Sequence, residues 1–401
     1  MITEGIEPEL GLLFASAHAS INQEQREHIV TLLHTQIDWG RVLEWAMRHH
    51  LAPLLFKTLS EHALDELPTT AFGALKLEFE KNRKQALFQV AELIRLVDAL
   101  RTEGITAIPF KGPALAHYLY SSAAHRVAGD LDFLLRAGDL DRALGVLARC
   151  GYTIGSTFSV NQERIFRQIA GQYQIVRADG RVIIEPHWEI GHRVFSFDIE
   201  YEGLWSRAVS FDVDGYSVQF LSPHDQIILL CTHGCKEHWI RLKWVSDVAE
   251  FLARNPELNW DLTLTRASEW GCRRMLLLGV SLAKELLGAS PPPILLEEVA
   301  ADRVVPDLLR SAIRGIIDLE RGTPDIWKIN AFRRRMRERP LDQLRYVLRT
   351  VFTPKPHHLH MISLPRHLSF GYYAVRCVHD YVGLPVWRMG KLIAGERETS
   401  G

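Results

Sequence analysis

Two short segments carry residues that together could act on phosphate. The first is Lys111-Gly112, and the second is Gly129-Asp130-Leu131-Asp132. Alternate residues of a strand point to the same side, so Asp130 and Asp132 are expected to share one face. Two carboxylates on one face can share a hard cation, and Mg²⁺ usually takes only one or two protein carboxylates while substrate phosphates supply further ligands. The pattern therefore indicates metal-assisted chemistry on a phosphate-bearing substrate.

The surrounding residues predict the elements that would position these groups. Residues 105–110 form a short apolar run of strand composition, and helical composition resumes at residues 114–120. Pro113 suits the first turn of that helix, because its missing N–H costs nothing there. A helix start behind a glycine turn offers free backbone N–H groups to an anion. The aspartates lie on a second expected strand, residues 127–135, ahead of an amphipathic helix over residues 137–149.

A third carboxylate is expected on a hairpin further along the chain. Residues 172–177 and 181–190 are predicted to form its two arms, with a glycine turn between them. On the second arm Glu185 and His187 share one face, so Glu185 is the candidate to complete a triad with the aspartates. Pro186 cannot donate to a ladder, so the sheet is expected to loosen beside it. Three roles stay open for His187: orienting Glu185, binding metal, or packing in the core.

These segments resemble a known family. The sequence is similar to the bacterial uncharacterised nucleotidyltransferases, which belong to the DNA polymerase beta-like nucleotidyltransferase superfamily. The resemblance is densest in three stretches: Phe110-Lys-Gly-Pro-Ala-Leu-Ala116, Arg126-Val-Ala-Gly-Asp-Leu-Asp-Phe-Leu-Leu135 and Ile184-Glu-Pro-His-Trp188. It continues at residues 37–55, at His233 and at residues 241–247.

The resemblance implies a function and a set of site residues. The implied reaction moves a nucleoside monophosphate from an NTP, ATP by default, to an unidentified acceptor hydroxyl or phosphate. Asp130, Asp132 and Glu185 would be the catalytic residues and would hold Mg²⁺ or Mn²⁺. The nucleotide side of the site would be formed by Lys111, Gly112, Arg126 and His187. The expected partners are the nucleotide and a small-molecule, peptide or protein acceptor, and nucleic acid is the less favoured alternative.

One departure from the superfamily leaves alternatives open. The sequence has Gly112-Pro113 where Gly-Gly or Gly-Ser is usual, which removes a backbone donor and a hydroxyl for the phosphates. A catalytically inactive binding or regulatory protein with the same fold is therefore a rival hypothesis. An RNA-modifying nucleotidyltransferase is a second alternative. For Arg126, the alternative to a triphosphate contact is an ion pair with Asp130 or Glu185.

The expected fold class is α+β. A small mixed sheet of four or five strands, in the range 105–221, would be flanked by helical regions on both sides. One long helix is predicted over residues 69–102, because apolar residues recur there near the helical period. A small sheet cannot bury its own core, so this helix and those after Ser222 must cover it. The predicted division is an N-terminal helical region, a nucleotidyltransferase core and a C-terminal helical region, at residues 1–104, 105–221 and 222–401.

Two groups of potential metal ligands are expected to have structural or surface positions rather than to bind metal. Cys231, Cys235 and His238 fall at helical spacing, but one helix presents at most three ligands and structural zinc usually takes four, so we expect packed core residues. The histidines at 357, 358, 360 and 367 lie between prolines and are expected at the surface.

Composition is ordinary, but charge is unevenly distributed. The chain is 47% hydrophobic and 24% charged, and no segment approaches the ~20 apolar residues of a membrane span. The N-terminus shows no signal-peptide pattern, so we expect a cytoplasmic protein without a membrane partner.

Residues 301–401 carry 18 Lys and Arg against 10 Asp and Glu, whereas the preceding residues carry 29 against 38. This basic region could receive phosphates or an acidic acceptor, and it is expected on the far wall of the catalytic cleft. The simpler interpretation is a solvated helix face, because aromatic residues do not alternate with the arginines.

Overall fold

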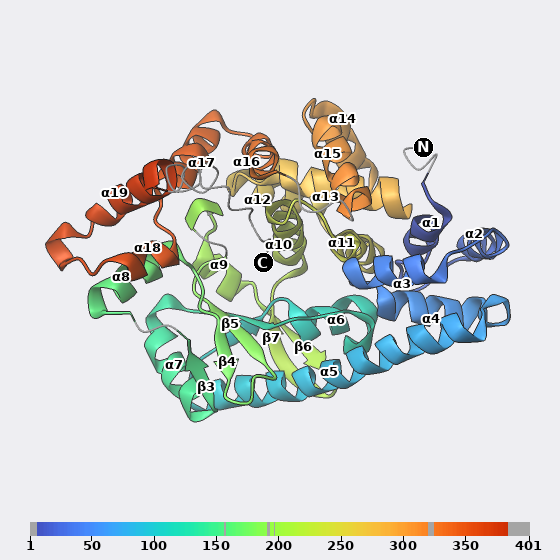
Figure 1. Ribbon diagram of the computed structural model, residues 1–401, viewed down its shortest axis with the longest axis horizontal. Coiled ribbons are helices and arrows are strands. Elements are labelled where there is room, and N and C mark those ends of the chain that lie inside the picture. Colours follow the sequence, from blue (N-terminus) through green and yellow to red (C-terminus); the bar gives the residue numbers. More distant parts are fainter. Residues whose placement is uncertain (1–5, 156–157, 191–192, 196, 320–324, 384–401) are drawn as a thin grey trace, which may run out of the picture.

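The computed structural model describes residues 6–155, 158–190, 193–195, 197–319 and 325–383 (Figure 1). Helices before and after a small mixed sheet make up most of it, so the predicted α+β class is confirmed. The N-terminal helices are α1 (Pro8–Ala15), α2 (Gln23–Leu33), α3 (Trp39–Arg48), α4 (Ala52–His62) and α5 (Thr69–Thr102).

The main sheet has five strands in the order β1-β2-β5-β4-β3. β2 and β5 run parallel, and the other neighbours are antiparallel. The strands are β1 (Ala107–Pro109), β2 (Leu131–Leu135), β3 (Tyr152–Ile154), β4 (Ile175–Arg177) and β5 (Ile183–His187). Three helices are interleaved with them: α6 (Gly112–Tyr120), α7 (Leu140–Arg149) and α8 (Val160–Ile169). Every residue of β2 is buried, as expected for a central strand that is covered on both faces.

After this sheet, α9 (Tyr201–Ser206) leads into a separate two-stranded hairpin of β6 (Val209–Val213) and β7 (Tyr216–Phe220). Both hairpins predicted from the sequence are therefore present. The remaining helices are α10 (Pro223–Lys236), α11 (Leu242–Arg254), α12 (Trp260–Glu269), α13 (Arg273–Leu287), α14 (Pro293–Ala301), α15 (Val305–Ile317), α16 (Ile326–Arg335), α17 (Pro340–Phe352), α18 (Pro356–Met361) and α19 (Gly371–Val378).

The long helix α5 has the bounds predicted from the sequence, and it runs from the N-terminal helices to the strand β3 at the edge of the sheet. It contacts α4 near its start, and near its other end Glu92 accepts a hydrogen bond from the Tyr152 hydroxyl of β3 at 2.7 Å. Figure 1 shows it running beneath the sheet from α4 to β3. The helix therefore covers the sheet and ties it to the N-terminal helices, as the small area of the sheet requires.

Several residues that interrupt the sequence pattern start or end helices. Asp38 accepts from the backbone N–H of Arg41 and caps α3, and Pro53 lies in the first turn of α4. Ser222 accepts from the N–H of Asp225 and caps α10, as predicted. Gly288 ends α13 with φ +65°, a left-handed conformation that favours glycine.

Pro186 interrupts the sheet on one side only. The Pro186 carbonyl accepts from the backbone N–H of Tyr173, so the edge of the proline faces β4. The β4–β5 ladder pairs Ile175 with Ile184 and Val176 with Ile183, and beyond it only an isolated bridge joins Gln172 to His187. The β2–β5 ladder continues through His187. The predicted loosening is therefore confirmed on the β4 side and absent on the β2 side, where no N–H of Pro186 is needed.

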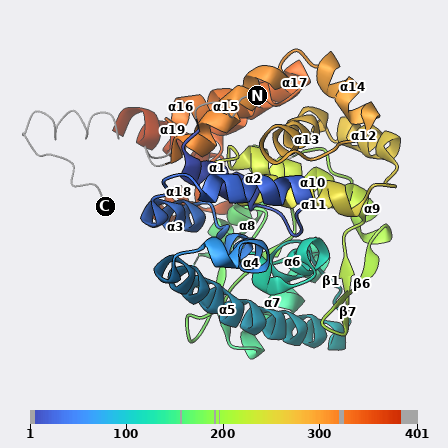
Figure 2. The same cartoon turned by 90° about the vertical axis from the view of Figure 1, so that its right-hand side faces the viewer.

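The helices α10 and α11 lie between the sheet region and the helices that follow them in the sequence. These two helices contact α13 on one side, and α11 contacts α6 on the other, so they lie between the sheet region and the outer helices (Figure 2). One hydrophobic core includes residues from Leu10 to Tyr346 and crosses all three predicted regions. The boundaries at residues 104/105 and 221/222 stay a prediction. Among the described residues, no helix is long and apolar enough to cross a bilayer.

Candidate active site

The turn from β1 to α6 brings Lys111 and Gly112 against the strand that carries the aspartates. Lys111 is the residue before α6, and Gly112 begins the helix with φ +58°. A Cβ at Gly112 would lie 3.0 Å from the backbone oxygen of Asp130. Both the left-handed φ and this close approach favour glycine. The glycine therefore allows the α6 N-terminus to sit directly beside the backbone of Asp130.

The structure brings Asp132, Glu185 and His187 together. Asp132 and Glu185 are paired in register across the parallel strands β2 and β5, so their side chains lie next to each other on one face. Ligand atoms of Asp132, Glu185 and His187 all lie within 4.8 Å of one another. The carboxylates of Asp132 and Glu185 are therefore close enough to share metal, because two cations about 3.5–4 Å apart could be shared only by carboxylates less than ~8 Å apart.

One carboxylate oxygen of Asp132 accepts hydrogen bonds from two neighbouring side chains. Its Oδ1 accepts from Lys111 Nζ at 3.1 Å and from His187 Nε2 at 3.0 Å. No hydrogen bond from the described residues reaches its Oδ2. His187 Nε2 also lies 3.6 Å from Glu185 Oε2, to which Gln172 Nε2 donates. The carboxylates are therefore fixed in place by donors, with one Asp132 oxygen left over.

Asp130 lies just before β2 rather than on it, so the prediction that both aspartates sit on one strand is wrong for this residue. It is half-buried and lines the same pocket as Asp132 and Glu185. Burial raises its pKa above the usual range of a carboxyl, and the charges of Asp132 and Glu185 raise it further. Burial also opposes ionisation of Asp132, but Lys111 and His187 outweigh it and lower that pKa. The cluster thus holds more negative charge than its own donors neutralise.

The donor set fits a hard divalent cation. Mg²⁺ and Mn²⁺ prefer carboxylate oxygens, and Asp130, Asp132 and Glu185 supply them around one pocket. His187 fits less well as a ligand, because ligation through Nε2 would remove the proton that it donates to Asp132. Its other nitrogen, Nδ1, is buried without a partner among the described residues, whereas metal-binding histidines usually donate from that second nitrogen.

A pocket of about 390 Å³ opens over these carboxylates. Besides six of the predicted site residues, all but His187, its wall includes basic groups that the sequence did not single out: His50, Lys236, Arg241 and Lys243. Gln172 and His233 also line it. His187 faces a smaller adjoining pocket, together with Phe110, Phe195 and Leu229.

 Six of the seven predicted site residues therefore line the larger pocket, and the seventh lines its neighbour.

The pocket residues that the sequence did not single out differ in how far the sequence could have indicated them. Arg241 and Lys243 fall in the segment noted for its similarity to the family, at the start of α11, but nothing in that segment indicated that it faces the aspartates. His50 follows α3, far from the aspartates in sequence, and only the tertiary fold brings it to the pocket. Gln172 had a usable signal, because it lies on the first arm of the predicted hairpin, opposite His187.

Arg126 has a partner that the sequence did not indicate. Its guanidinium donates from Nε to Asp247 Oδ1 and from Nη2 to Asp247 Oδ2, each at 2.9 Å. Tyr120 donates to the same carboxylate at 3.0 Å. The ion pair predicted with Asp130 or Glu185 is therefore wrong, because the buried Asp247 of α11 takes this cation in a two-bond geometry. Arg126 still lines the pocket, and its contact with a triphosphate stays a prediction.

The far wall of the pocket is not made by the basic residues after position 300. No described residue beyond Trp244 lines it, so the predicted position of the basic region is wrong. Several arginines of residues 333–339 contact other parts of the protein instead. Arg333 donates to the Lys236 carbonyl at 3.0 Å, Arg335 pairs with Asp307 at 2.7 Å, and buried Arg337 lies over aromatic rings, Phe197 among them. Counting charges along the sequence could not reveal these internal contacts.

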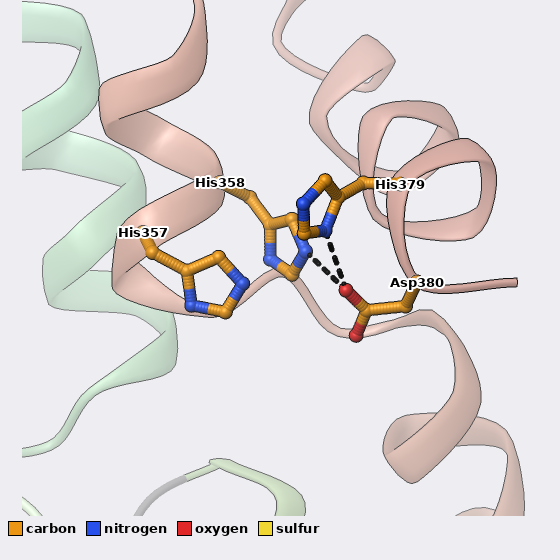
Figure 3. A group of neighbouring side chains, drawn as sticks. All are labelled: His357, His358, His379 and Asp380. Atoms are coloured by element: carbon orange, nitrogen blue, oxygen red, sulfur yellow. Dashed lines mark hydrogen bonds and ion pairs between the residues drawn. The ribbon is translucent and has the colours of Figure 1, made fainter. Parts of the chain in front are cut away.

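A second group of metal-ligand types lies in the C-terminal region, at His357, His358, His379 and Asp380 (Figure 3). Asp380 Oδ1 accepts from His358 Nε2 at 3.0 Å and from His379 Nδ1 at 2.8 Å. His358 Nδ1 accepts from the Lys355 backbone N–H at 2.9 Å, which places the ring proton on Nε2, where a metal would bind. The donors thus satisfy this carboxylate without a cation. His358 is fully buried, so the prediction of a surface residue is wrong for it.

The cysteines behave as the sequence predicted. Cys231 and Cys235 are buried in the core, and neither belongs to a group of potential metal ligands among the described residues. All five cysteines of the chain are free thiols.

Comparison with known proteins gives one match. The model of a family described as "Uncharacterised nucleotidyltransferase" matches residues 35–288, more than half of the chain. This range contains every residue that lines the larger pocket, from His50 to Trp244. No curated protein and no solved structure matches the chain.

Proposed function

Because the chain belongs to this uncharacterised nucleotidyltransferase family, we propose that it transfers a nucleoside monophosphate from an NTP to an acceptor hydroxyl or phosphate. We place it in the DNA polymerase beta-like superfamily, with ATP as the default donor and Mg²⁺ or Mn²⁺ as the cofactor. The observation that carries the proposal is the cross-strand pair of Asp132 and Glu185 beside Asp130, at the floor of a pocket with basic walls.

Asp130, Asp132 and Glu185 would hold the cations through their carboxylate oxygens. When bound, the metal neutralises the charge that develops on the entering and leaving oxygens of an in-line displacement. Asp132 would use Oδ2, because Lys111 and His187 already occupy Oδ1. In this arrangement His187 is a positioning residue for Asp132.

The acceptor oxygen would form a bond to the α-phosphorus while the bond from that phosphorus to the bridging oxygen breaks. Pyrophosphate leaves with the electron pair of the broken bond, and the proton of an acceptor hydroxyl passes to Glu185. Glu185 has one oxygen bonded by Gln172, and the same carboxylate lies opposite Asp132, so it is oriented toward the cluster. Lys111 would balance charge near the phosphates, although Asp132 already binds its ammonium group.

The acceptor would be a small molecule, a peptide or a protein. RNA modification loses its support, because no described residue of the basic region after position 300 lines the pocket. We also propose a cytoplasmic location, since free thiols suit a reducing compartment.

The Gly112-Pro113 pair favours one rival, a binding protein that has lost the reaction. Pro113 lies in the first turn of α6 and has no N–H to offer a phosphate. A single experiment separates the two functions. Purified protein is incubated with Mg²⁺ or Mn²⁺, each α-labelled NTP and a pool of small-molecule and protein acceptors, and label transfer is compared with Asp132→Asn.

Transfer that requires Asp132 supports the enzyme. Calorimetry on the same samples reports nucleotide binding independently of transfer. Metal-dependent NTP binding without transfer to any acceptor, or to the protein itself, supports the binding protein. The absence of both binding and transfer contradicts both functions.

A further inference from the structure

Part of the pocket wall carries basic side chains that have no carboxylate partner among the described residues. Arg241 lies over the ring of Trp244, and among the described residues Lys243 Nζ donates to the Val127 carbonyl alone, at 3.1 Å. Neither residue forms an ion pair among the residues that the structure describes. The nearby Asp247 is already bound by two bonds from Arg126. This part of the pocket therefore has an excess of positive charge.

The backbone at this wall is already satisfied, so the side chains carry the charge that it offers. Leu242 N donates to His49 Nδ1 at 3.2 Å, and Lys243 N donates to the His49 carbonyl at 3.3 Å. The start of α11 is thus capped by His49 rather than open to an anion. His50, the next residue, lines the pocket with its Nδ1 buried and without a hydrogen-bond partner among the described residues.

Keeping these cations together costs stability unless an anion binds there. Burial, then Arg126, and also Arg241, lower the pKa of Lys243 to about 7, even though Asp247 and Asp130 act in the opposite direction. Burial, then Lys243, Arg241 and Arg126, lower the pKa of His50 to about 3. A partly buried ammonium without a carboxylate partner is unfavourable, and groups perturbed in this way cluster at functional sites.

We propose that Arg241 and Lys243 bind the β- and γ-phosphates of the NTP, which become the pyrophosphate leaving group. This inference rests on the proposed function and adds to it the part of the substrate that is recognised. The cationic wall and the carboxylates line one pocket of about 390 Å³. An NTP in this pocket would present its α-phosphate to metal held at the carboxylates and its terminal phosphates to the wall.

Its test is calorimetry of inorganic tripolyphosphate, ATP and AMP in the presence of Mg²⁺, with the full chain. The variants are Arg241→Gln and Lys243→Met, and Arg254→Gln is the matched control. Arg254 lies at the end of α11, is exposed, and bonds Ser121 outside the pocket. We expect each pocket variant to weaken tripolyphosphate and ATP at least tenfold and AMP less than twofold. We expect Arg254→Gln to change none of the three by more than twofold.

Tripolyphosphate affinity that changes less than twofold in both pocket variants would overturn the proposal. An equal loss for AMP and tripolyphosphate would also contradict it, because the wall would then bind some other part of the nucleotide. The proposed function is tested separately by Asp132→Asn. If that variant abolishes transfer while the two wall variants bind normally, the enzyme stands and the phosphate subsite falls. If tripolyphosphate binding depends on the wall but no transfer occurs, the subsite stands and the enzyme falls.

Folding of the variants is checked by thermal melting. Lys243→Met keeps the length of the side chain and removes a partly buried charge, so its melting temperature should equal or exceed that of the wild type. A purely structural lysine would instead lower the melting temperature when replaced, and affinity for tripolyphosphate would be retained.

Discussion

Asp132 and Glu185 stand opposite each other on adjacent parallel strands, one register position from the strand residues Phe133 and Pro186. Parallel pairing fixes their side chains on the same face of the sheet, although they are far apart in sequence. The separation of the two carboxylates is thus set by the backbone ladder rather than by flexible loops. Rigid strands hold catalytic groups more closely than loops do.

Replacing single aspartates should separate the metal site from the fold. Asp130→Asn should weaken metal-dependent NTP binding and leave the melting temperature equal or higher, because Asp130 repels its carboxylate neighbours. Asp132→Asn should also lower stability, by about 1–3 kcal/mol, because Lys111 and His187 lose a charged acceptor. Calorimetry and thermal melting measure both effects. Unchanged NTP affinity in both variants would exclude this metal site.

Glu185→Gln should lower turnover by at least a hundredfold while NTP binding is largely retained. The amide keeps the shape of the side chain and one oxygen that can accept from Gln172, but it cannot take a proton from an acceptor. Glu189→Gln is the matched control, since Glu189 follows on the same chain segment but lines neither pocket. Steady-state kinetics and a binding titration measure the two quantities. A variant of Glu189 that loses activity, beside an active Glu185→Gln, would assign the third acid to Glu189.

Gly112→Ala should damage both the fold and the site. Its φ of +58° is unfavourable for alanine, and the added Cβ would meet the Asp130 oxygen at 3.0 Å. We expect a loss of about 1–2 kcal/mol of stability and a weaker affinity for Mg²⁺, because Asp130 must move. Gly138→Ala is the control, since a Cβ there meets nothing within 4 Å. Equal melting temperatures and metal affinities for the two variants would show that the turn tolerates a side chain.

Lys243 should make stability depend on pH. Its folded pKa of about 7 lies below the unfolded value of 10.5, so the unfolded chain binds more protons between these pH values. Stability should therefore rise with pH from about 7 to 10, and this contribution should be missing in Lys243→Met. The variant should exceed the wild type most at pH 6 to 7 and least near pH 10. Denaturant titrations at several pH values measure this, and an equal pH slope in both proteins would contradict it.

Bound phosphate should also return the proton to Lys243. Tripolyphosphate affinity should be fullest below pH 7, where the free lysine is charged, and should decline at higher pH. Calorimetry near pH 8 in buffers of different ionisation enthalpy should show proton uptake in the wild type and less uptake in Lys243→Met. Equal uptake in the two proteins would mean that another group takes the proton.

Arg126→Met should lower stability by about 3–5 kcal/mol, because it leaves the buried Asp247 without its ion-pair partner. Adding Asp247→Asn should restore part of the loss. If the main role of Arg126 is to fix α11, the restored double variant should bind tripolyphosphate far better than Arg241→Gln does. A double variant that folds well and binds tripolyphosphate as weakly as Arg241→Gln would instead assign Arg126 to the phosphates.

Local patterns were enough to predict the elements around the carboxylates. The period of the apolar residues in α5, the glycine turn after β1 and the Ser222-Pro223 start of α10 each depend on neighbouring residues. The nearness of Asp132 and Glu185 was predicted for the same reason, since each side chain direction follows from strand alternation. Their parallel pairing needed the tertiary structure.

The basic part of the pocket wall could not be predicted in this way. His50 reaches it from the end of α3, and Lys243 reaches it from α11, which packs against α6. No spacing along the chain relates these residues to the aspartates. The arginines near Arg337 misled for a related reason, because a count of charges does not distinguish exposed cations from buried ones.

All described residues that line the larger pocket lie between His50 and Trp244 in the sequence. No described residue of α14 to α19 lines it. These helices reach it only indirectly, for example where Arg333 donates to the carbonyl of Lys236, a lining residue. The C-terminal helices can therefore be exchanged without changing the lining of the pocket. Chimeras that exchange the segment after Gly288 between family members would keep every described residue that lines this pocket, and any difference in acceptor choice that travels with the exchanged segment would map specificity to it.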